Sequence, residues 1–294
     1  MALATNPVDI NRGTTGLTLT PEQSNEIIAK AVEQSFVMQS AERVTLPGRG
    51  LSIPVITGEP TADFVAETAE KPVSEHTFST KTMTPYKIAV IELFSNEFRR
   101  DFRGLYDELA RRLPYAISRK VDSTIINGTA PGTGFDVLTA ATAQDIETDA
   151  YTGLVNAYGA IATAGYRPTG FVLSPAAEVL LYSAKDKNDR PLFLPSIADG
   201  SVGSILGTPV VKNGNVYVAG NPNIVGLVGD WSKAKWGMVG DISMSVSEEA
   251  TVNTGTEQVN LWQRNMFALR CEVEFGFICT DAAAFVKLTG ATGA

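Results

Sequence analysis

The sequence predicts an α+β fold, because helical and strand patterns both occur along the chain without the regular βαβ alternation of a parallel sheet. Apolar residues at helical spacing mark Pro21–Phe36, Tyr151–Ala164 and Pro175–Ser183. Strand spacing is clearest near the C-terminus, where every second residue from Phe267 to Phe277 is apolar. The 294 residues suffice for one large domain or two ordinary ones.

The first expected element is a helix that follows a polar N-terminal arm. Residues 1–19 are small, polar and rich in Gly and Thr, so they have no core of their own. Thr20 is a typical N-cap, Pro21 occupies the first helical position, and Gln23 completes a capping box. These signals place the helix over Pro21–Phe36.

The next segment, Ala41–Phe94, is punctuated by Pro and Gly. Its β-prone runs are Leu51–Ile56, His76–Thr82 and Tyr86–Phe94. The second run is almost wholly polar, so a hairpin built from it buries too little to be stable alone and needs another surface. Between Glu59 and Glu75 acidic residues outnumber the single Lys71. That stretch is either a solvated acidic loop or an extended arm that docks on a basic surface of a neighbour.

A long basic helix is expected next. Apolar residues recur every fourth position, and because four residues turn 400° the apolar stripe moves around the helix. Pro114 is expected to kink the helix, and Asn127-Gly128 to end it. The apolar residues are Leu105, Leu109, Leu113, Ile117, Val121 and Ile125, and the basic ones are Arg99, Arg100, Arg103, Arg111, Arg112, Arg119 and Lys120. The basic residues form either a solvated face or an interface.

A second module follows a loop at Gly128–Ala143. Besides the two helices named above, it carries short strand patterns at Phe171–Ser174, Gly207–Val211, Val216–Val218 and Ile224–Val228. Trp231–Val246 is aromatic and Gly-rich, and Ala282–Leu288 closes the chain with small and apolar residues.

Net charge and cysteine content exclude some classes of function and location. The chain carries 24 Lys and Arg against 32 Asp and Glu, a net charge of −8, which argues against a free-standing nucleic-acid binder. Cys271 and Cys279 lie eight residues apart in a predicted strand, roughly 26 Å, which is too far for a disulfide. We therefore expect reduced core thiols and a cytoplasmic compartment. Residues 1–11 show no secretion signal, and no apolar run reaches membrane-spanning length.

Catalytic, cofactor and metal motifs are not expected. The single histidine, His76, lies in the polar hairpin and is expected to be exposed. The Gly-rich stretches at 128–134 and 226–229 lack the spacing of a phosphate or dinucleotide site. Asp186, Asn188 and Asp189 alternate like calcium ligands but lack the turn Gly and the closing Glu of a calcium loop. We predict no enzymatic activity, no cofactor and no metal.

Six phrases, in this order, carry a resemblance across roughly residues 44–288. They are Ser95-Asn96-Glu97 leading to Ile126-Asn127-Gly128, Gly170–Pro175, Asp189–Phe193, Leu206–Val211, Gly229–Ser232, and Phe267–Glu272 with Ala284–Leu288. The order resembles the tailed-phage major capsid family, whose Hong Kong 97-type fold is shared with encapsulins. The resemblance implies a subunit that self-assembles into pentamers and hexamers of an icosahedral head enclosing double-stranded DNA.

The resemblance also implies a division of the chain. It gives an N-terminal arm with a short helix over 1–40, an extended β-hairpin arm (E-loop) over 41–94, a peripheral domain with a spine helix over 95–150 and 247–294, and an axial domain over 151–246. The last strand and Phe285–Leu288 would return to the peripheral sheet. The expected assembly interface comprises Glu59, Asp63, Phe64, Glu67, Glu70, Lys71, Arg99, Arg100, Arg103, Arg111 and Arg112.

Partners follow from the same resemblance. They are copies of the chain itself, separate scaffolding, portal and cement proteins, and packaged DNA bound without sequence specificity, with no membrane. About 40 residues precede the arm, so scaffolding is expected to be a separate protein. The location is the virion capsid, assembled in the host cytoplasm.

Alternatives within and outside the family stay open at this point. Some relatives crosslink an arm lysine to a neighbour, for which Lys71, Lys81 and Lys87 are the candidates; we expect no such crosslink. A cargo compartment of encapsulin type has the same fold, and the sequence has no feature that separates it from a phage shell. A soluble enzyme of unknown class is the distant alternative.

Overall fold

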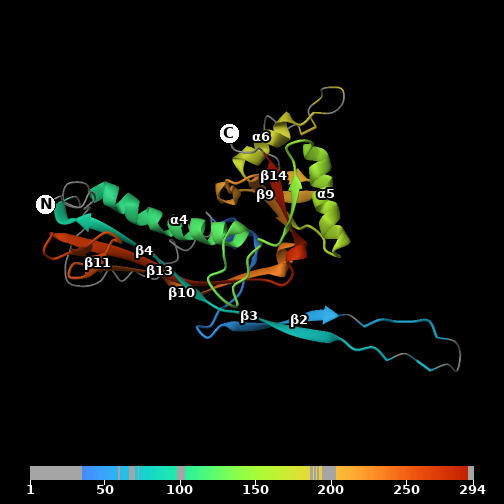
Figure 1. Cartoon of the computed structure of the whole chain (residues 1–294), viewed down its shortest axis with the longest axis horizontal. Helices are drawn as coiled ribbons and strands as arrows, with labels where there is room; N and C mark the ends of the chain where they lie inside the picture. The colour runs from blue at the N-terminus through green and yellow to red at the C-terminus, as the bar shows by residue number, and fades with distance from the viewer. Residues whose placement is uncertain are drawn as a thin grey trace.

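The computed structural model describes residues 35–58, 60–65, 70–71, 73–97, 103–185, 188, 190, 192–193 and 203–290, without the side chains of 57, 103–111 and 113. Helices and sheets mix as the sequence predicts (Figure 1). Most of the predicted helix Pro21–Phe36 lies outside these residues. From Ser35 onward, Ser35 caps a short helix α2, Phe36–Ser40, by accepting a hydrogen bond from the Met38 N–H.

A long four-stranded sheet forms one part of the described chain. Its order is β1-β10-β13-β4, with β13 antiparallel to both neighbours. The strands are β1 Glu42–Arg43, β4 Tyr86–Ser95, β10 Ala234–Ser247 and β13 Met266–Cys279. The predicted alternation in β13 is confirmed: Phe267, Leu269 and Phe275 are buried, whereas Arg270 is exposed on the other face.

The helix α4, Arg103–Asn127, lies along this sheet (Figure 1). Its apolar residues Ile117, Val121 and Ile125 share one core with Phe94 and Phe267. Pro114 lies inside the helix without ending it. The predicted stop is confirmed, because α4 ends at Asn127 and the Gly128 N–H donates to Thr124 O at 3.0 Å.

A six-stranded sheet of order β5-β14-β9-β6-β8-β7 forms the second part. Its strands are β5 Thr142–Asp145, β6 Gly170–Leu173, β7 Ser204–Ile205, β8 Thr208–Lys212, β9 Asn223–Gly229 and β14 Phe285–Gly290. Two helices, α5 Ala150–Thr163 and α6 Pro175–Ser183, bury Leu154, Ile161 and Leu181 in one core with this sheet. The predicted start of α6 is confirmed, since Ser174 Oγ caps it and Pro175 occupies its first position.

Four expectations are wrong in detail. Residues 216–218 form no continuous strand: a 3₁₀ turn, η1 Gly214–Val216, capped by Asn213, takes up Val216, and Val218 alone pairs, in an isolated antiparallel bridge with Ile224. The strand β4 pairs with β13 and not with the hairpin arm, so the two-stranded arm ends at Met83. The strand β14 pairs with β9 and does not return to the sheet of β13. Conversely, β10, expected in the axial part, joins the long sheet.

Small elements complete the described chain. They are the 3₁₀ turns η2 Trp231–Lys233 and η3 Ala282–Ala284, and the hairpin of β11 Thr251–Asn253 and β12 Gln258–Asn260. No helix among the described residues is long and apolar enough to cross a membrane.

Both cysteines lie in β13, where they are buried and unbonded to each other, as predicted. Burial raises the pKa of each thiol to about 12. We expect neither thiol to react with a disulfide reagent at pH 8 in the native subunit, and both to react after unfolding in urea. A Thr80→Cys variant, with its thiol on an exposed strand position, provides the reactive control. Rapid native labelling of Cys271 or Cys279 would contradict the buried positions.

Candidate assembly surfaces

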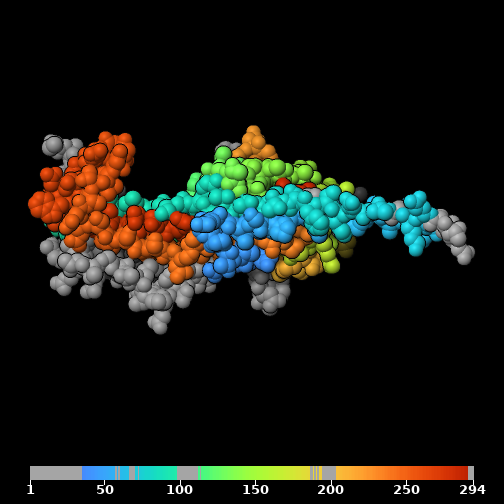
Figure 2. Space-filling view, turned by 90° about the horizontal axis from the view of Figure 1, so that it is seen from below, coloured from blue at the N-terminus to red at the C-terminus, as the bar shows by residue number. Residues whose placement is uncertain are grey.

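The hairpin arm is formed by β2 Leu51–Gly58 and β3 Thr77–Met83, which pair antiparallel. It projects away from both large sheets, and the space-filling view shows it extending beyond the rest of the chain (Figures 1 and 2). Past the paired strands, the Thr61 N–H donates to Ser74 Oγ at 2.8 Å, which keeps the two outgoing segments together. Among the described residues, the arm is therefore an element whose distal half is not supported by either large sheet.

One face of the arm anchors it to the long sheet. Leu51, Ile53 and Met83 pack in a small core with Leu46 and Ile278.

Polar contacts strengthen the same anchor. Lys81 Nζ donates to Asp136 Oδ2 at 3.0 Å and to Cys279 O at 2.6 Å. Asp136 Oδ2 also accepts from the Cys279 N–H at 3.0 Å, so one carboxylate ties the arm to the end of β13. The Lys81 amine is therefore engaged within the subunit, which leaves Lys71 and Lys87 as the more exposed of the arm lysines considered for crosslinking.

The opposite face of the arm carries no charge. Ile56 and Phe78 are directly opposed cross-strand partners and are 58% and 69% exposed. The His76 ring lies 6.0 Å from the Phe78 ring and is itself exposed, as predicted. The remaining outward positions between the root and this pair are Ser52, Pro54, Thr80 and Thr82. We call this the outward face: an apolar pair at its distal end, surrounded by uncharged groups.

Sequence reasoning missed the outward face because it depends on the pairing register. The signal was available only as two separate apolar residues, Ile56 and Phe78, in two different runs. Once the register places them opposite each other, they form a continuous exposed patch of a kind that soluble subunits cover on assembly.

The predicted interface residues that the structure describes fall into two groups that lie far apart within the subunit. Asp63, Phe64, Glu70 and Lys71 are exposed on the distal arm, and Arg112 is exposed on α4. Figure 1 shows the distal arm and the first turns of α4 at opposite ends of the molecule. Glu59, Glu67, Arg99 and Arg100, and the side chains of Arg103 and Arg111, lie outside the described residues. A contact between the described acidic residues of the distal arm and Arg112 would therefore require two different subunits.

A buried carboxyl, Asp122, joins three distant parts of the chain. Its Oδ1 accepts from Ser35 Oγ at 2.6 Å and from the Val37 N–H at 3.5 Å, at the start of α2. Its Oδ2 accepts from Asn215 Nδ2 at 2.9 Å, in η1. Burial raises the pKa of Asp122 to about 7, although these hydrogen bonds act to lower it. The carboxyl thus ties α4 to the root of the N-terminal arm and to the six-stranded sheet.

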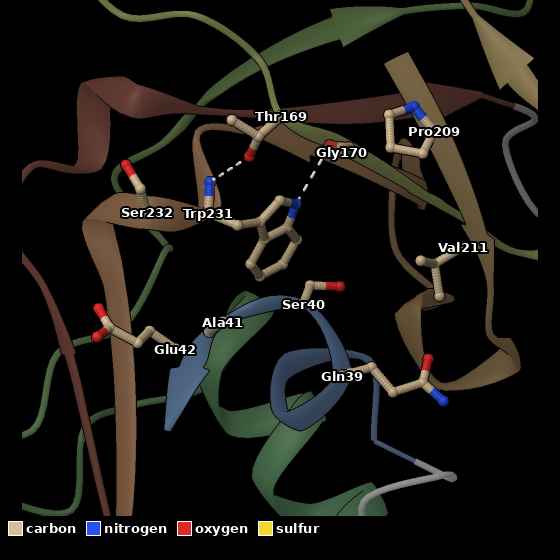
Figure 3. A pocket seen from close by; sticks show the side chains of 10 residues that line it. All are labelled: Gln39, Ser40, Ala41, Glu42, Thr169, Gly170, Pro209, Val211, Trp231 and Ser232. Atoms are coloured by element: carbon tan, nitrogen blue, oxygen red, sulfur yellow. Dashed lines mark hydrogen bonds between the residues drawn. The ribbon is translucent and has the colours of Figure 1, made fainter. Parts of the chain in front are cut away.

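A cavity of about 490 Å³ lies between α2 and the six-stranded sheet (Figure 3). Its lining comes from residues 39–42, the start of β6, strand β8 and η2, with the Trp231 indole held by a bond from Nε1 to Gly170 O at 3.2 Å. The single carboxylate of the lining, Glu42, is paired with Lys235. This lining lacks the paired acid–base groups of a catalytic site.

The part of the chain that the structure describes contains no cluster of metal-binding side chains either. Among the residues that the structure describes, no three His, Cys, Asp or Glu side chains gather as metal ligands would. Asp186 and Asp189 of the calcium-like pattern lie outside those residues.

Comparison with known proteins accounts for this combination of a projecting arm and two large sheets. A family model described as the phage capsid family matches residues 15–290. The chain belongs to the phage capsid family. This capsid-family chain is 32% identical to gp17 of Mycobacterium phage L5, named a probable major capsid protein, over 92% of this chain and 89% of that one. It is 27% identical to the major capsid protein of Enterobacteria phage HK97, over 79% of this chain and 58% of that protein.

Solved structures show the same fold. A chain from Gordonia phage Cozz superposes with a TM-score of 0.75 at 23% identity, covering 100% of this chain and 92% of that chain. One from Mycobacterium phage Bobi gives 0.74 at 25% identity, covering 88% and 91%. The Hong Kong 97-type α+β fold expected of this capsid-family chain is thereby confirmed.

Proposed function

We propose that this chain is the major shell-forming subunit of a tailed-phage head, in which pentamers and hexamers enclose double-stranded DNA. Family membership over residues 15–290 supports the proposal, as do relatives named major capsid proteins. These matched relatives are phage proteins, so an encapsulin-like cargo compartment is not favoured. We assign the chain a structural role without catalysis, cofactor or metal.

The observation that carries this function is the arm, which is fixed at its root and bare at its distal half. Lys81 and the Met83 cluster hold the root, whereas Ile56 and Phe78 present apolar surface that is 58% and 69% exposed in the part of the subunit that the structure describes. Burying this pair on a neighbour contributes about 1 to 3 kcal/mol per arm. Repeated around closed symmetry, many such modest contacts add up to a stable shell.

Partners and location follow from the proposed role. A net charge of −8 suits a container wall that must not hold DNA tightly. Separate scaffolding, portal and cement proteins would complete the head, and assembly would take place in the host cytoplasm before the protein reaches its place in the virion.

Negative-stain electron microscopy of the purified protein tests the function directly. We expect closed particles tens of nanometres across when the protein is concentrated, alone or with the scaffolding protein of its phage. Size-exclusion chromatography at high dilution should return free subunits or single rings. A chain that stays monomeric at high concentration in both settings would contradict the shell function.

A further inference from the structure

The short helix α2 forms a bridge between the two parts of the molecule. We call residues 35–41, which are α2 with one flanking residue on each side, the strap. Its far end is fixed to the long sheet, because Trp236 Nε1 donates to Ala41 O at 3.1 Å and the next residues pair with β10 as β1. At its near end, the Phe36 ring packs edge-on against Trp231 of η2, with the ring centres 6.1 Å apart. The strap can thus be released at its near end while its far end stays attached.

The carboxyl of Asp122 holds the near end of the strap through polar contacts. Its Oδ1 accepts from Ser35 Oγ and from the Val37 N–H of the strap, and its Oδ2 accepts from Asn215 Nδ2 of η1. Ser35 Oγ also accepts from the Met38 N–H at 3.1 Å, so one hydroxyl both caps α2 and bonds to the carboxyl. If the carboxyl left this position, the support of the cap and the link to η1 would be lost together.

The strap borders the cavity of about 490 Å³ on the side of the six-stranded sheet (Figure 3). Gln39, Ser40 and Ala41 line the cavity from the strap, and Pro209 and Val211 line it from β8. Ser40 Oγ is buried there without a hydrogen-bond partner among the described residues. Close packing and hydrogen bonding normally fix a buried segment, and both are incomplete on this side of the strap. The strap therefore has room to move towards the six-stranded sheet.

An ionised Asp122 has no positively charged partner among the described residues. The strap and η1 contribute only apolar and uncharged polar side chains to this joint. Charged groups of the surrounding elements are exposed or engaged elsewhere: Arg119 and Lys120 are exposed on α4, Lys212 of β8 pairs with Glu178, Lys235 of β10 pairs with Glu42, Arg43 of β1 lies over the Trp236 ring, and Lys233 of η2 lies over the Tyr166 ring. Burial raises the pKa of Asp122 to about 7, and uncharged donors of the strap and η1 counteract it. Ionisation therefore places an unpaired charge inside the joint.

We propose that Asp122 is a pH-controlled latch on the strap: the protonated carboxyl keeps the near end in place, and ionisation releases that end while both sheets stay folded. In the released strap the carboxyl meets water, which solvates its charge. The far end stays fixed at Ala41, and the cavity gives room for the movement. Because residues 1–34 precede the strap in the sequence, its release also frees the root of the N-terminal arm. The latch acts within one subunit, so it does not depend on the proposed shell function.

Proton linkage gives the direction of the effect. In the closed strap the pKa of Asp122 is about 7, whereas in the released strap it returns towards the ordinary value of 3.8. The closed strap therefore binds the proton more tightly and is most favoured in acid. As the pH rises between these two values, release becomes easier by up to about tenfold per pH unit, and the effect levels off above the folded pKa. From pH 5.5 to pH 8 the equilibrium constant for release should rise roughly thirtyfold.

Amide hydrogen exchange of the wild-type subunit tests the latch. The Val37, Met38 and Ala41 N–H groups all donate hydrogen bonds in the closed strap, so they exchange only when it opens. We expect their protection factors, corrected for the intrinsic effect of pH on exchange, to fall at least about tenfold between pH 5.5 and 8. They should also exchange faster than the amides of β13 and respond less to low urea, because the strap opens without the sheet. Protection that does not fall with pH overturns the inference, as do strap and β13 amides that exchange together at every urea concentration.

Three variants assign the effect to this carboxyl. Asp122→Asn carries no titrating group, so the protection of its strap should not depend on pH. Asp149→Asn, the same exchange at the exposed cap of α5, is the matched control and should keep the pH dependence of the wild type. Ser35→Ala removes the hydroxyl that bonds to the carboxyl, and should lower the protection at least about tenfold already at pH 5.5. A pH dependence in Asp122→Asn equal to that of the wild type overturns the inference, and so does wild-type protection of the strap in Ser35→Ala.

Discussion

Replacing Ile56 by Lys and Phe78 by Glu together is expected to give folded subunits that no longer form closed shells. The two side chains are direct cross-strand partners, so the introduced charges attract each other and the hairpin keeps its register. The apolar patch disappears while the net charge stays the same. Loss of about 1 to 3 kcal/mol at every arm weakens each contact roughly 5- to 150-fold, and a shell sums many such contacts. Particle counts by electron microscopy measure assembly, and circular dichroism with thermal melting checks the fold.

A conservative double variant provides the matched control for the arm. Ile56→Val with Phe78→Tyr keeps an apolar, strand-compatible pair and is expected to assemble nearly as well as the wild type. Neutralising the acidic distal arm with Asp63→Asn and Glu70→Gln tests the charge interpretation separately. If the outward face carries the contact, this second pair lowers assembly only modestly and mainly at low salt. Normal shells from the Lys–Glu variant would show that the outward face is not part of the contact.

Local patterns in the sequence were sufficient to predict the helices and strands that are determined by interactions between residues close in sequence. The alternation from Phe267 to Phe277 predicts β13 because one face of that strand packs under α4. Ser174 and Pro175 predict the start of α6 because a cap acts within one turn. The strand expected at 216–218 was wrong for a related reason: Asn213 caps a 3₁₀ turn that includes Val216, so only Val218 is left to pair, as a single bridge with Ile224.

Features that depend on pairing between distant segments could not be predicted in the same way. The pattern of Tyr86–Phe94 fixes a strand but not its partner, and the partner is β13, more than 170 residues later. Likewise, the outward face exists only in the register that sets Ile56 against Phe78. Charge composition directed attention to the acidic arm, whereas the exposed apolar side chains, Trp262 included, become evident only when burial is known.

Asp122 shows most clearly how little a local pattern says about distant contacts. Its hydrogen-bond partners Ser35 and Asn215 lie 87 and 93 residues away in sequence. In the sequence this residue is one aspartate in a long helix, near Arg119 and Lys120. In the structure its carboxyl is fully buried, and uncharged donors from two other elements surround it. The free energy of unfolding therefore depends on pH through Asp122, and the sequence alone does not predict this dependence.

We expect Asp122 to make the free subunit less stable as the pH rises from 5 to 8. Its folded pKa, about 7, lies above the ordinary value of 3.8, so between these values the folded chain binds one more proton than the unfolded chain. The stabilisation is fully present below the unfolded pKa and is lost as the pH rises through 7. From pH 5 to pH 8 the free energy of unfolding should fall by roughly 2 to 3 kcal/mol through this group alone.

Urea unfolding of the wild type and of Asp122→Asn at several pH values isolates this contribution, because the other titrating groups cancel in the difference. Asparagine keeps the shape and carries no charge, so the wild type should lose stability relative to the variant as the pH rises from 5, with the loss slowing near the folded pKa of about 7 and levelling off above it. Asp149→Asn is the control: its exposed carboxylate caps α5, and bonds from Thr152 hold its pKa below the ordinary value. That contribution is lost only in acid, below the range tested, so the wild type and this variant should differ by a constant amount from pH 5 to 8. A constant difference for Asp122→Asn as well would mean that Asp122 stays ionised throughout. The joint between α4, α2 and η1 would then be held by a permanent buried charge, and the root of the N-terminal arm would be insensitive to pH in this range.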